Sequence, residues 1–409
     1  MNDPAPLCVL VSRYPAISHT FIRREIEALR ALGVQVETAS LRTPGEDELL
    51  VEIDRQERQR TFYVQPVRPF AVMGAVLRAF VLQPARTMAT ARLAFRHRKQ
   101  GIRGLVWAAF HLVEALYLSA ELRRRGVRHI HSHFANAGGT VGLLASKQLG
   151  IGWSLTLHGL SDFGDPVGQR LREKFELARL IVCVSEHGRQ QALEITGGKL
   201  ADRIHVVRCG LGEDAFEAAA SSASQEGPLK LVCVGRLAPE KGHAGLLDAL
   251  AEARALGLDA ELRLIGEGPE RAALEQRVRK LGLEAQVVLP GARGGSELRK
   301  EFAAADLFVL SSLMEGLPVT LMEALATGTP VIAPRLSGIP ELVRDEQDGW
   351  LFATGRFDQL AQALIVAQEK RSRLPSMGAE GREQVRGLHD ARRSGEQLKE
   401  LLAATGAWG

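Results

Sequence analysis

Cysteine is scarce in this chain of 409 residues. The four cysteines, Cys8, Cys183, Cys209 and Cys233, each stand alone in an apolar run, with no C-x-x-C pair and no spacing typical of metal ligands. This pattern excludes a disulfide framework and a cysteine zinc site. We therefore expect the cysteines to be buried strand residues in a reducing cytoplasm.

Long apolar runs are missing as well. Arg78 and Glu114 interrupt the two best candidates for a membrane span of about 20 apolar residues. No charged segment followed by an apolar one opens the chain, as it would in a signal peptide. We expect a cytoplasmic protein with neither a transmembrane helix nor a leader.

Several further patterns are absent from the sequence. It has no G-x-G-x-x-G after its first strand, which argues against a dinucleotide fold, and no D-x-D motif at any expected strand end. Zinc-finger spacing, sequence-specific DNA-binding modules and the aromatic motifs of RNA-binding domains are also lacking. We therefore expect no nucleic-acid partner, and a nucleic-acid-binding protein is the last of the alternatives.

The length and the 45% hydrophobic content favour two domains, each with its own core. Charge is distributed unevenly between parts of the chain. Residues 55–128 hold fifteen Lys and Arg against three Asp and Glu, a local charge of +12, whereas the whole chain carries +4, which leaves about −8 for the rest. Such asymmetry indicates an anionic partner for one part only.

The basic part, an insertion at about residues 44–128, is expected to be helical. Its apolar segments, PFAVMGAVLRAFVL and GLVWAAFHLVEALYLSAELRRR, are interleaved with arginines and aromatic residues. Such a region can lie on an anionic membrane surface. The alternative is a set of core helices with a solvated basic exterior, and the sequence leaves both open.

The first domain, at residues 1–212, opens as a strand, a loop and a helix. We expect strands at 8–11 and 34–39 and a helix at 21–32, with Ile22, Ile26 and Leu29 on one apolar face. In a parallel sheet this places the loop SRYPAISHT at the carboxyl edge, where α/β folds bind ligands.

Histidines mark two further strand ends of this domain. In HIHSHF, residues 129–134, three histidines alternate on one strand face, and His133 is the one nearest the strand end. Metal binding by this row is a minority interpretation, because no suitable further ligand follows. His158 ends the next strand, before Gly159. It can hydrogen-bond a sugar hydroxyl or a leaving phosphate, or it can be a satisfied core histidine.

A second parallel sheet is expected after a small, polar linker at residues 213–228. The second domain spans 229–385, and a charged helix at 386–409 follows. Arg236 and Lys241 bracket the first turn, PEKG, so two cations converge on one loop where they can bind phosphate. Gly266 and Gly268 end the next strand in a turn where backbone can approach a base or ribose closely.

The stretch SSLMEGLPVTLMEALATGTPVIAP, residues 311–334, is the most informative part of the sequence. Pro318 suits a first helical turn and Gly328 the position after a helix, which predicts a helix at 319–327. Glu315 precedes this helix and Glu323 lies inside it. Helix N-termini attract anions, and acceptor-only carboxylates bind sugar hydroxyls. The pattern therefore predicts a phosphate-and-sugar site.

These motifs resemble the retaining glycosyltransferases of family 4. The pattern S-x-x-E-G-L-P with E-A-L-A-x-G-x-P-V-I-A resembles their nucleotide-sugar site, and G-R-L-x-x-x-K-G resembles their diphosphate clamp. The resemblance implies an α/β protein of two Rossmann-like domains that face a cleft, the GT-B fold, in which the helix at 386–409 returns to the first domain. It also implies catalytic roles for His158 and Glu315, and donor-binding roles for Arg236, Lys241, Gly266, Gly316, Leu317 and Glu323.

The opening run YPAISHTFIRREI is similar to F-P-x-x-S-E-T-F-I-x-x-E-I of glycosyltransferases from bacterial exopolysaccharide clusters, with His19 in place of Glu. This similarity implies an acceptor-side group of Ser18, His19, Thr20 and His133. It implies a nucleotide-diphosphate-sugar donor and a glycan or polyprenyl-diphosphate-linked acceptor. We expect no cofactor and no metal, because Arg236 and Lys241 can stabilise the departing diphosphate. A sugar-nucleotide epimerase of the same fold is the main alternative.

Overall fold

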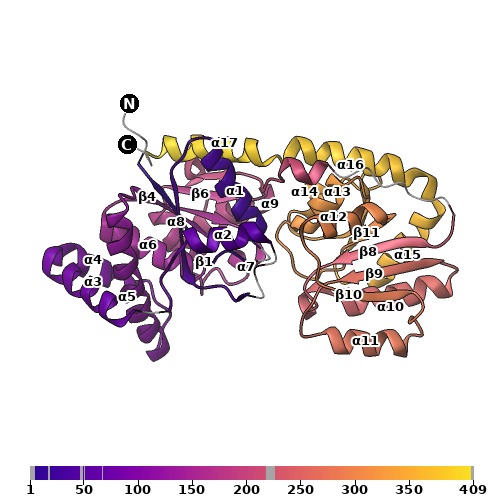
Figure 1. The fold of residues 1–409 in the computed structure, drawn as a ribbon, viewed down its shortest axis with the longest axis horizontal. Coiled ribbons are helices and arrows are strands. Elements are labelled where there is room, and N and C mark those ends of the chain that lie inside the picture. Colours follow the sequence, from indigo (N-terminus) through magenta and orange to yellow (C-terminus); the bar gives the residue numbers. More distant parts are fainter. Residues whose placement is uncertain are drawn as a thin grey trace. The chain divides into compact units, whose positions relative to one another are not determined.

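A computed structural model describes residues 5–16, 19–46, 49, 51–66, 68–217 and 226–406. It divides the chain into two compact units (Figure 1). Unit 1 comprises Met1–Arg208 and Ala391–Gly409, and unit 2 comprises Cys209–Asp390. Each unit has a parallel sheet of its own, so the α/β class with two Rossmann-like domains is confirmed.

Unit 1 is built on a seven-stranded sheet in the order β3-β2-β1-β4-β5-β6-β7. The segments LCVLV and LIVC of this sheet are continuous apolar runs, as expected for strands that are buried on both faces, whereas its middle strand, HIHSH, is buried but polar. In the register, Leu7 lies opposite Val36 on one side and His129 on the other. The strands are β1 (Leu7–Arg13), β2 (Val36–Arg42), β3 (Phe62–Tyr63), β4 (His129–His133), β5 (Gly152–Leu157), β6 (Leu180–Cys183) and β7 (Ile204–Val206).

Capping residues set the ends of two helices beside this sheet. Asn136 accepts a hydrogen bond from the Gly138 amide at the start of α6, and Ser185 does the same for Gly188 at the start of α9. The helices of unit 1 are α1 (Thr20–Ala31), α2 (Glu52–Arg60), α3 (Pro69–Leu82), α4 (Pro84–Arg96), α5 (Ile102–Arg124), α6 (Ala137–Leu149), α7 (Leu160–Phe163), α8 (Leu171–Leu177), α9 (Glu186–Thr196) and α17 (Ala391–Ala404).

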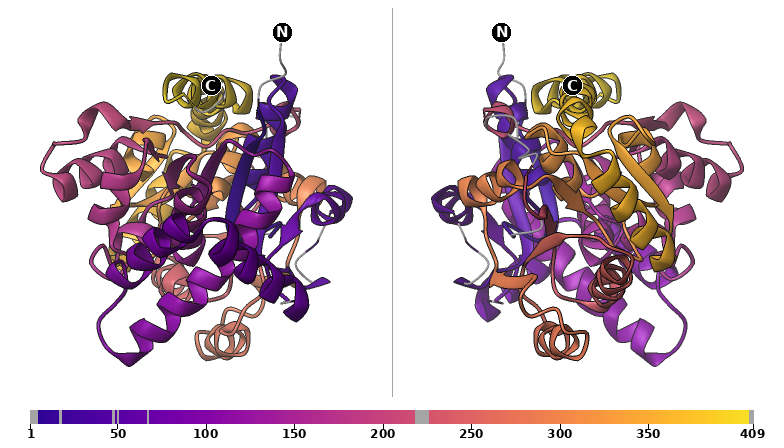
Figure 2. Two further views of the ribbon diagram at one scale, coloured as in Figure 1. Left: turned by 90° about the vertical axis from the view of Figure 1, so that its left-hand side faces the viewer. Right: turned by 90° about the vertical axis from the view of Figure 1, so that its right-hand side faces the viewer.

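The predicted insertion at about 44–128 forms β3 and the helices α2 to α5, which can be followed in Figures 1 and 2. In the described chain, α5 is the one helix long and apolar enough to cross a membrane by length and composition. It packs against α3, α4 and α6 and buries Glu114, Leu116 and Leu118, as a core helix does.

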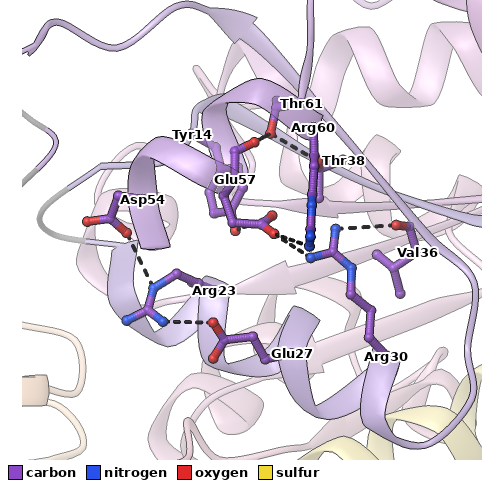
Figure 3. Close-up of polar contacts among 10 residues, drawn as sticks. All are labelled: Tyr14, Arg23, Glu27, Arg30, Val36, Thr38, Asp54, Glu57, Arg60 and Thr61. Carbon is purple, nitrogen blue, oxygen red and sulfur yellow. Dashed lines mark hydrogen bonds and ion pairs between the residues drawn. The ribbon is translucent and has the colours of Figure 1, made fainter. Parts of the chain in front are cut away.

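Helix α2 is fixed to unit 1 by a buried polar cluster (Figure 3). The carboxylate of Glu57 forms an ion pair with Arg30 of α1 and accepts a hydrogen bond from the buried Tyr14 hydroxyl at 3.3 Å. Arg23 of α1 lies 3.3 Å from the carboxylate of Asp54. These contacts hold α2 against α1 and against the loop that follows β1.

Unit 2 is built on a six-stranded parallel sheet in the order β10-β9-β8-β11-β12-β13. The strands are β8 (Leu229–Val234), β9 (Ala260–Ile265), β10 (Val287–Gly291), β11 (Leu307–Val309), β12 (Val331–Arg335) and β13 (Gly349–Ala353). The helices are α10 (His243–Ala255), α11 (Arg271–Lys280), α12 (Gly295–Ala304), α13 (Val319–Ala326), α14 (Ile339–Leu342), α15 (Phe357–Glu369) and α16 (Leu374–Leu388).

The start of the predicted linker belongs to unit 2. Leu211, Ala215 and Phe216 are buried in its core, and residues 218–225 lie outside the described residues. Near the other end of unit 2, the Leu211 amide donates to the carbonyl of His389 at 2.7 Å. The two segments that enter and leave unit 2 are thus joined by a hydrogen bond.

The chain ends in unit 1 rather than in unit 2. Helix α17 packs beside α1, and its Leu398 and Leu402 are buried with Ile22 and Ile26 of that helix (Figure 1). The Lys399 ammonium donates to the carbonyl of Leu32 at 2.9 Å. The tail at 386–409, expected as one helix, is divided between α16 and α17.

Candidate functional site

A cation and a carboxylate meet where β8 and β11 end in unit 2. The Lys241 ammonium donates to Oε1 of Glu315 at 2.6 Å, and the Ser312 hydroxyl donates to the same oxygen at 2.7 Å. The Lys241 side chain is 25% exposed and that of Glu315 10% exposed. Both residues come from loops at the carboxyl edge of the parallel sheet, where α/β folds bind ligands.

Arg236 lies in the same loop as Lys241 but has a different partner. It forms an ion pair with Glu240, and its side chain is mostly exposed. The Glu240 carbonyl accepts a hydrogen bond from the Leu313 amide at 2.9 Å, which ties the loop after β8 to the loop after β11. Each predicted clamp cation thus has a carboxylate partner of its own.

The turn at Gly266 and Gly268 approaches backbone closely. A Cβ at Gly266 would lie 1.8 Å from the carbonyl oxygen of Gly235, and one at Gly268 would lie 2.3 Å from that of Leu237. Both glycines also have positive φ angles, 153° and 159°. The close approach that the sequence predicted for a ligand is occupied here by the neighbouring loop, so packing alone already requires glycine.

The helix that carries Glu323 begins at Val319, as predicted, and ends at Ala326, one residue earlier than expected. Gly328 follows it with a φ of 79°. Glu323 is half-buried within α13, whereas Gly316 and Leu317 lie in the loop before it. The loop therefore presents Glu315, Gly316 and Leu317 together at the start of α13.

His158 and His133 of unit 1 are joined by a hydrogen bond. Nδ1 of the buried His133 lies 2.9 Å from Nε2 of the half-buried His158. The rings of Phe21 and Phe134 pack against His158, with centroids 4.7 and 4.5 Å away. Burial, followed by the neighbouring His133, lowers the pKa of His158 well below its ordinary value, so this imidazole is neutral near pH 7.

Two of the three other predicted acceptor-side residues are described. His19 hydrogen-bonds the carbonyl of Arg13 at 3.0 Å and packs against Phe134, and burial lowers its pKa to about 4. Thr20 is the first residue of α1, and Ser18 lies outside the described residues.

The remaining histidines of β4 are buried core residues, and among the described residues the buried Nδ1 of His129 has no hydrogen-bond partner. His129 hydrogen-bonds the Ser154 hydroxyl, and the two nitrogens of His131 bond the hydroxyls of Ser154 and Thr156 at 2.7 and 2.8 Å. Within the described part of the chain, one group of side chains could hold a metal: Glu25, His131 and His133, with ligand atoms within 4.8 Å of one another. Both nitrogens of His131 are already engaged by hydroxyl groups, so this set fits a metal poorly.

Asp162 is a buried residue to which the sequence analysis gave no role. Its fully buried carboxylate accepts hydrogen bonds from the amides of Ala135 and His158, at 2.6 and 2.7 Å. Burial raises the pKa of Asp162 to about 6, and burial lowers the pKa of nearby Lys174 to about 7. The acidic residue four positions after a strand-ending histidine was the available signal, because such a spacing lets a carboxylate bind the strand-end amides.

An exposed apolar surface lies on the helical insertion. We call it the apolar platform and define it by six residues of α3 and α5, each more than half exposed: Phe70, Met73, Leu77, Ile102, Val106 and Trp107; Val81 and Leu82 at the end of α3 are similarly exposed. These two helices contact one another. Arg78, Arg92 and Arg103 are exposed on α3, α4 and α5, without a carboxylate partner in the described chain. A surface that is both apolar and basic is typical of contact with anionic membranes.

Two family models cover most of the chain. Residues 18–214 match "Glycosyltransferase Family 4", and residues 214–384 match "Glycosyl transferases group 1". The two matches meet in the segment that links the two sheets.

The matches to curated relatives cover either nearly the whole chain or about half of it. The chain is 28% identical to the colanic acid biosynthesis glycosyltransferase WcaL of Escherichia coli, over 96% of this chain and 98% of WcaL. It is 32% identical to the amylovoran biosynthesis glycosyltransferase AmsK of Erwinia amylovora, over 51% of this chain and 52% of AmsK.

Solved structures share the fold at low sequence identity. HepE of Anabaena, crystallised with UDP, matches with a TM-score of 0.72 and 18% identity, over 98% of this chain and all of HepE. A sucrose-phosphate synthase of Thermosynechococcus elongatus matches with a TM-score of 0.76 and 20% identity, over 99% of this chain and 100% of the synthase chain.

Proposed function

The chain belongs to the family 4 glycosyltransferases of the GT-B fold, and we propose that it moves a sugar from a nucleotide-diphosphate sugar to a glycan or polyprenyl-diphosphate-linked acceptor. The product would be an exopolysaccharide or another cell-surface polysaccharide. This part of the proposal is supported by the relatives that are named for colanic acid and amylovoran biosynthesis. A nucleotide-sugar donor is supported by the neighbour crystallised with UDP.

The observation that carries the proposal is the pair of Lys241 and Glu315 at the carboxyl edge of the unit 2 sheet. We assign Lys241 and the more exposed Arg236 to the diphosphate, since each cation has donors left beyond its carboxylate contact. Glu315 would accept hydrogen bonds from the donor sugar and Glu323 from the ribose, with Gly266, Gly316 and Leu317 beside them. His158 of unit 1 would bind a hydroxyl of the sugar or the leaving phosphate.

The reaction breaks the bond between the anomeric carbon and a diphosphate oxygen, and it forms a bond from that carbon to an acceptor hydroxyl oxygen. The hydroxyl proton leaves with the nucleoside diphosphate. Negative charge grows on the diphosphate in the transition state, where Arg236 and Lys241 can stabilise it. We propose that this suffices without a metal and that the configuration of the anomeric carbon is retained, as the family resemblance implies.

Calorimetric titration with UDP and with GDP tests the donor site. Arg236→Ala, Lys241→Ala and Glu323→Ala should each weaken binding of the nucleotide sugar. Lys280→Ala is the matched control, because it removes an exposed cation from α11 of the same unit. Unchanged donor binding in all three variants would refute the site assignment.

Two alternatives remain as outcomes of the same experiments. A nucleotide sugar converted to its epimer, with no acceptor present, would indicate an epimerase. Binding of DNA with no binding of nucleotide diphosphates would indicate a nucleic-acid-binding protein.

We further propose that the apolar platform and its arginines hold the enzyme on the inner face of the cell membrane, where a lipid-linked acceptor would lie. Each basic residue near an anionic surface contributes about 1 kcal/mol, and burying apolar side chains contributes more. The platform includes Trp107, whose side chain is exposed, so its fluorescence should shift to the blue when the helix enters the membrane interface.

Flotation with vesicles that contain phosphatidylglycerol tests the membrane contact. Neutralising Arg78, Arg92 and Arg103 should reduce binding mainly at low salt, because the Debye length falls from about 10 Å at 0.1 M to about 3 Å at 1 M. Replacing Phe70 and Ile102 by Ser should reduce binding at both salt concentrations. A protein that stays in the soluble fraction at low salt would show that these residues are only a solvated surface.

A further inference from the structure

Three side chains of unit 1 form a row that ends at His158. Oε1 of Glu25, on α1, lies 3.1 Å from Nε2 of His133, at the end of β4. Nδ1 of His133 lies 2.9 Å from Nε2 of His158, which follows β5. The contact between Glu25 and His133 is within ion-pair range but is not aligned as a hydrogen bond, and neither of its two buried atoms bonds another described residue.

The order of the row decides which nitrogen of each ring carries a proton. A neutral imidazole has one N–H donor and one acceptor nitrogen, and an ionised carboxylate only accepts. With Glu25 at one end, the favoured arrangement places the proton of His133 on Nε2, facing the carboxylate. Nδ1 of His133 is then an acceptor, so His158 must donate to it from Nε2. This leaves Nδ1 of His158 as an acceptor.

The surroundings of His158 keep that acceptor in place. Its Nδ1 has no hydrogen-bond partner among the described residues, and the residue is half-buried, so the atom is available to a ligand. The amide of His158 is fixed by the buried Asp162, and the rings of Phe21 and Phe134 pack against the imidazole. Rotation of the ring is therefore restricted by packing as well as by His133.

The same atoms have an alternative use as metal ligands, together with His131. In that case a ring nitrogen of His131 would have to release the Ser154 or Thr156 hydroxyl that it now bonds. The row needs no such exchange, because both nitrogens of His133 already face a neighbour of suitable type and no contact of His131 has to change. The geometry therefore favours the row over the metal.

We propose that Glu25 and His133 are positioning residues that hold His158 as its Nε2–H tautomer, so that Nδ1 of His158 accepts a hydrogen bond from a hydroxyl group of the substrate. The tautomer depends on unit 1 alone. The identity of the ligand as the donor sugar depends on the function proposed above. Glu25 acts only through His133 and does not itself contact substrate.

Nitrogen-15 NMR of histidine-labelled full-length protein, dialysed against a chelator, tests the tautomer without any substrate. We expect the His158 signals to show an unprotonated Nδ1 and a protonated Nε2. Glu25→Leu should give a mixture of tautomers, whereas Glu25→Gln should keep the native one, because its amide oxygen still accepts from His133. Glu27→Gln is the matched control on α1, since Glu27 faces Arg23 instead.

Three results would overturn the proposal. The first is a wild-type His158 protonated at Nδ1. The second is a tautomer that does not change in Glu25→Leu. The third is one equivalent of zinc in the undialysed protein that disappears in Glu25→Leu, because the three side chains would then be metal ligands. If Glu25→Leu fails to fold, the spectra of the wild type and of Glu25→Gln still show which tautomer His158 adopts.

Kinetics then separates this role from a structural one. With whichever of UDP-glucose and GDP-mannose the enzyme consumes, Glu25→Leu should lower kcat/KM about tenfold, as expected for one misdirected hydrogen bond. Its affinity for the bare nucleoside diphosphate should stay within about twofold, because that ligand lacks the sugar that is transferred. Equal losses in both would contradict the proposal. If neither donor is consumed, the proposed function fails on that point, while the tautomer is still decided by NMR.

Discussion

Neutralising Lys241 and neutralising Glu315 should change the affinity for an anionic ligand in opposite directions. Lys241→Met removes a cation and leaves the carboxylate of Glu315 facing the same space, with the Ser312 hydroxyl as its remaining partner among the described residues. Glu315→Gln removes the negative charge and releases Lys241. An anionic ligand such as UDP or GDP should therefore bind more weakly to the first variant and more tightly to the second.

The size of each effect follows from the geometry of the pair. The two charged atoms are 2.6 Å apart and mostly shielded from water. A unit charge about 6 Å from a phosphate, at an effective dielectric constant of about 30, contributes roughly 1.8 kcal/mol. Partial exposure and salt reduce this to about 1 kcal/mol. We thus expect a change of about five- to tenfold in the dissociation constant for each variant, with the double variant close to wild type.

Calorimetric titration at 0.1 M and 1 M salt measures both variants. The differences should shrink at 1 M, because the charges are screened. Arg263→Met is the matched control, since it breaks an ion pair with Glu301 in the same unit. Turnover of the full donor should fall in Glu315→Gln even though the diphosphate binds more tightly, because the sugar loses its carboxylate. Weaker diphosphate binding in Glu315→Gln would refute the reasoning, since it would show that the pair supports the loops rather than tuning the charge.

Three further outcomes are expected. Glu57→Gln should lower the free energy of unfolding of unit 1 by about 2–3 kcal/mol, because the buried partner of Arg30 loses its charge. Glu52→Gln, on the exposed face of the same helix, should change this free energy by less than about 0.5 kcal/mol. Both variants can be measured by urea unfolding, with hydrogen exchange in α1 as the probe. Burial raises the pKa of Glu114 to about 7, above its unfolded value of 4.5, so the folded state binds more protons between these values and stability falls as the pH rises from 4.5 to 7. Glu114→Gln should remove that slope and be more stable than wild type at pH 8, by up to about 3 kcal/mol, and equal stability of the two proteins at pH 8 would contradict this. Turnover should persist in EDTA, and activity lost in EDTA and restored by magnesium or manganese would show that a metal is needed.

The fold could be predicted from local signals. Alternating apolar runs and amphipathic segments located the strands and helices of both sheets, and Pro318 with Gly328 placed α13 to within one residue at its end. These features depend on neighbours in sequence, such as helix caps and strand ends. The division of the tail between α16 and α17 was missed, although Gly387 stands two residues before the break at His389 and Asp390.

The partners of the site residues could not be predicted. Lys241 and Glu315 were both assigned to a ligand, yet they bind each other across 74 positions of sequence. Asp162 received no role from the sequence, because its contacts depend on amides that fold around it. Glu25 lay inside the matched opening motif and received no role. Such contacts arise when loops from separate strands meet at one sheet edge, and sequence spacing does not encode that meeting.

The return of the last helix to unit 1 has a consequence for the order of folding. Unit 2 is one continuous segment, Cys209–Asp390, inserted into unit 1, whereas the core of unit 1 includes Leu398 and Leu402 of α17. A chain that emerges from the ribosome therefore releases every residue of unit 2 before it releases the last core residues of unit 1. Domains generally fold as units during synthesis, starting from the N-terminus. The apolar face of α1 therefore stays exposed, or is covered by a chaperone, until α17 has been synthesised. A nascent chain stalled after Asp390 would contain all of unit 2 but would lack part of the core of unit 1.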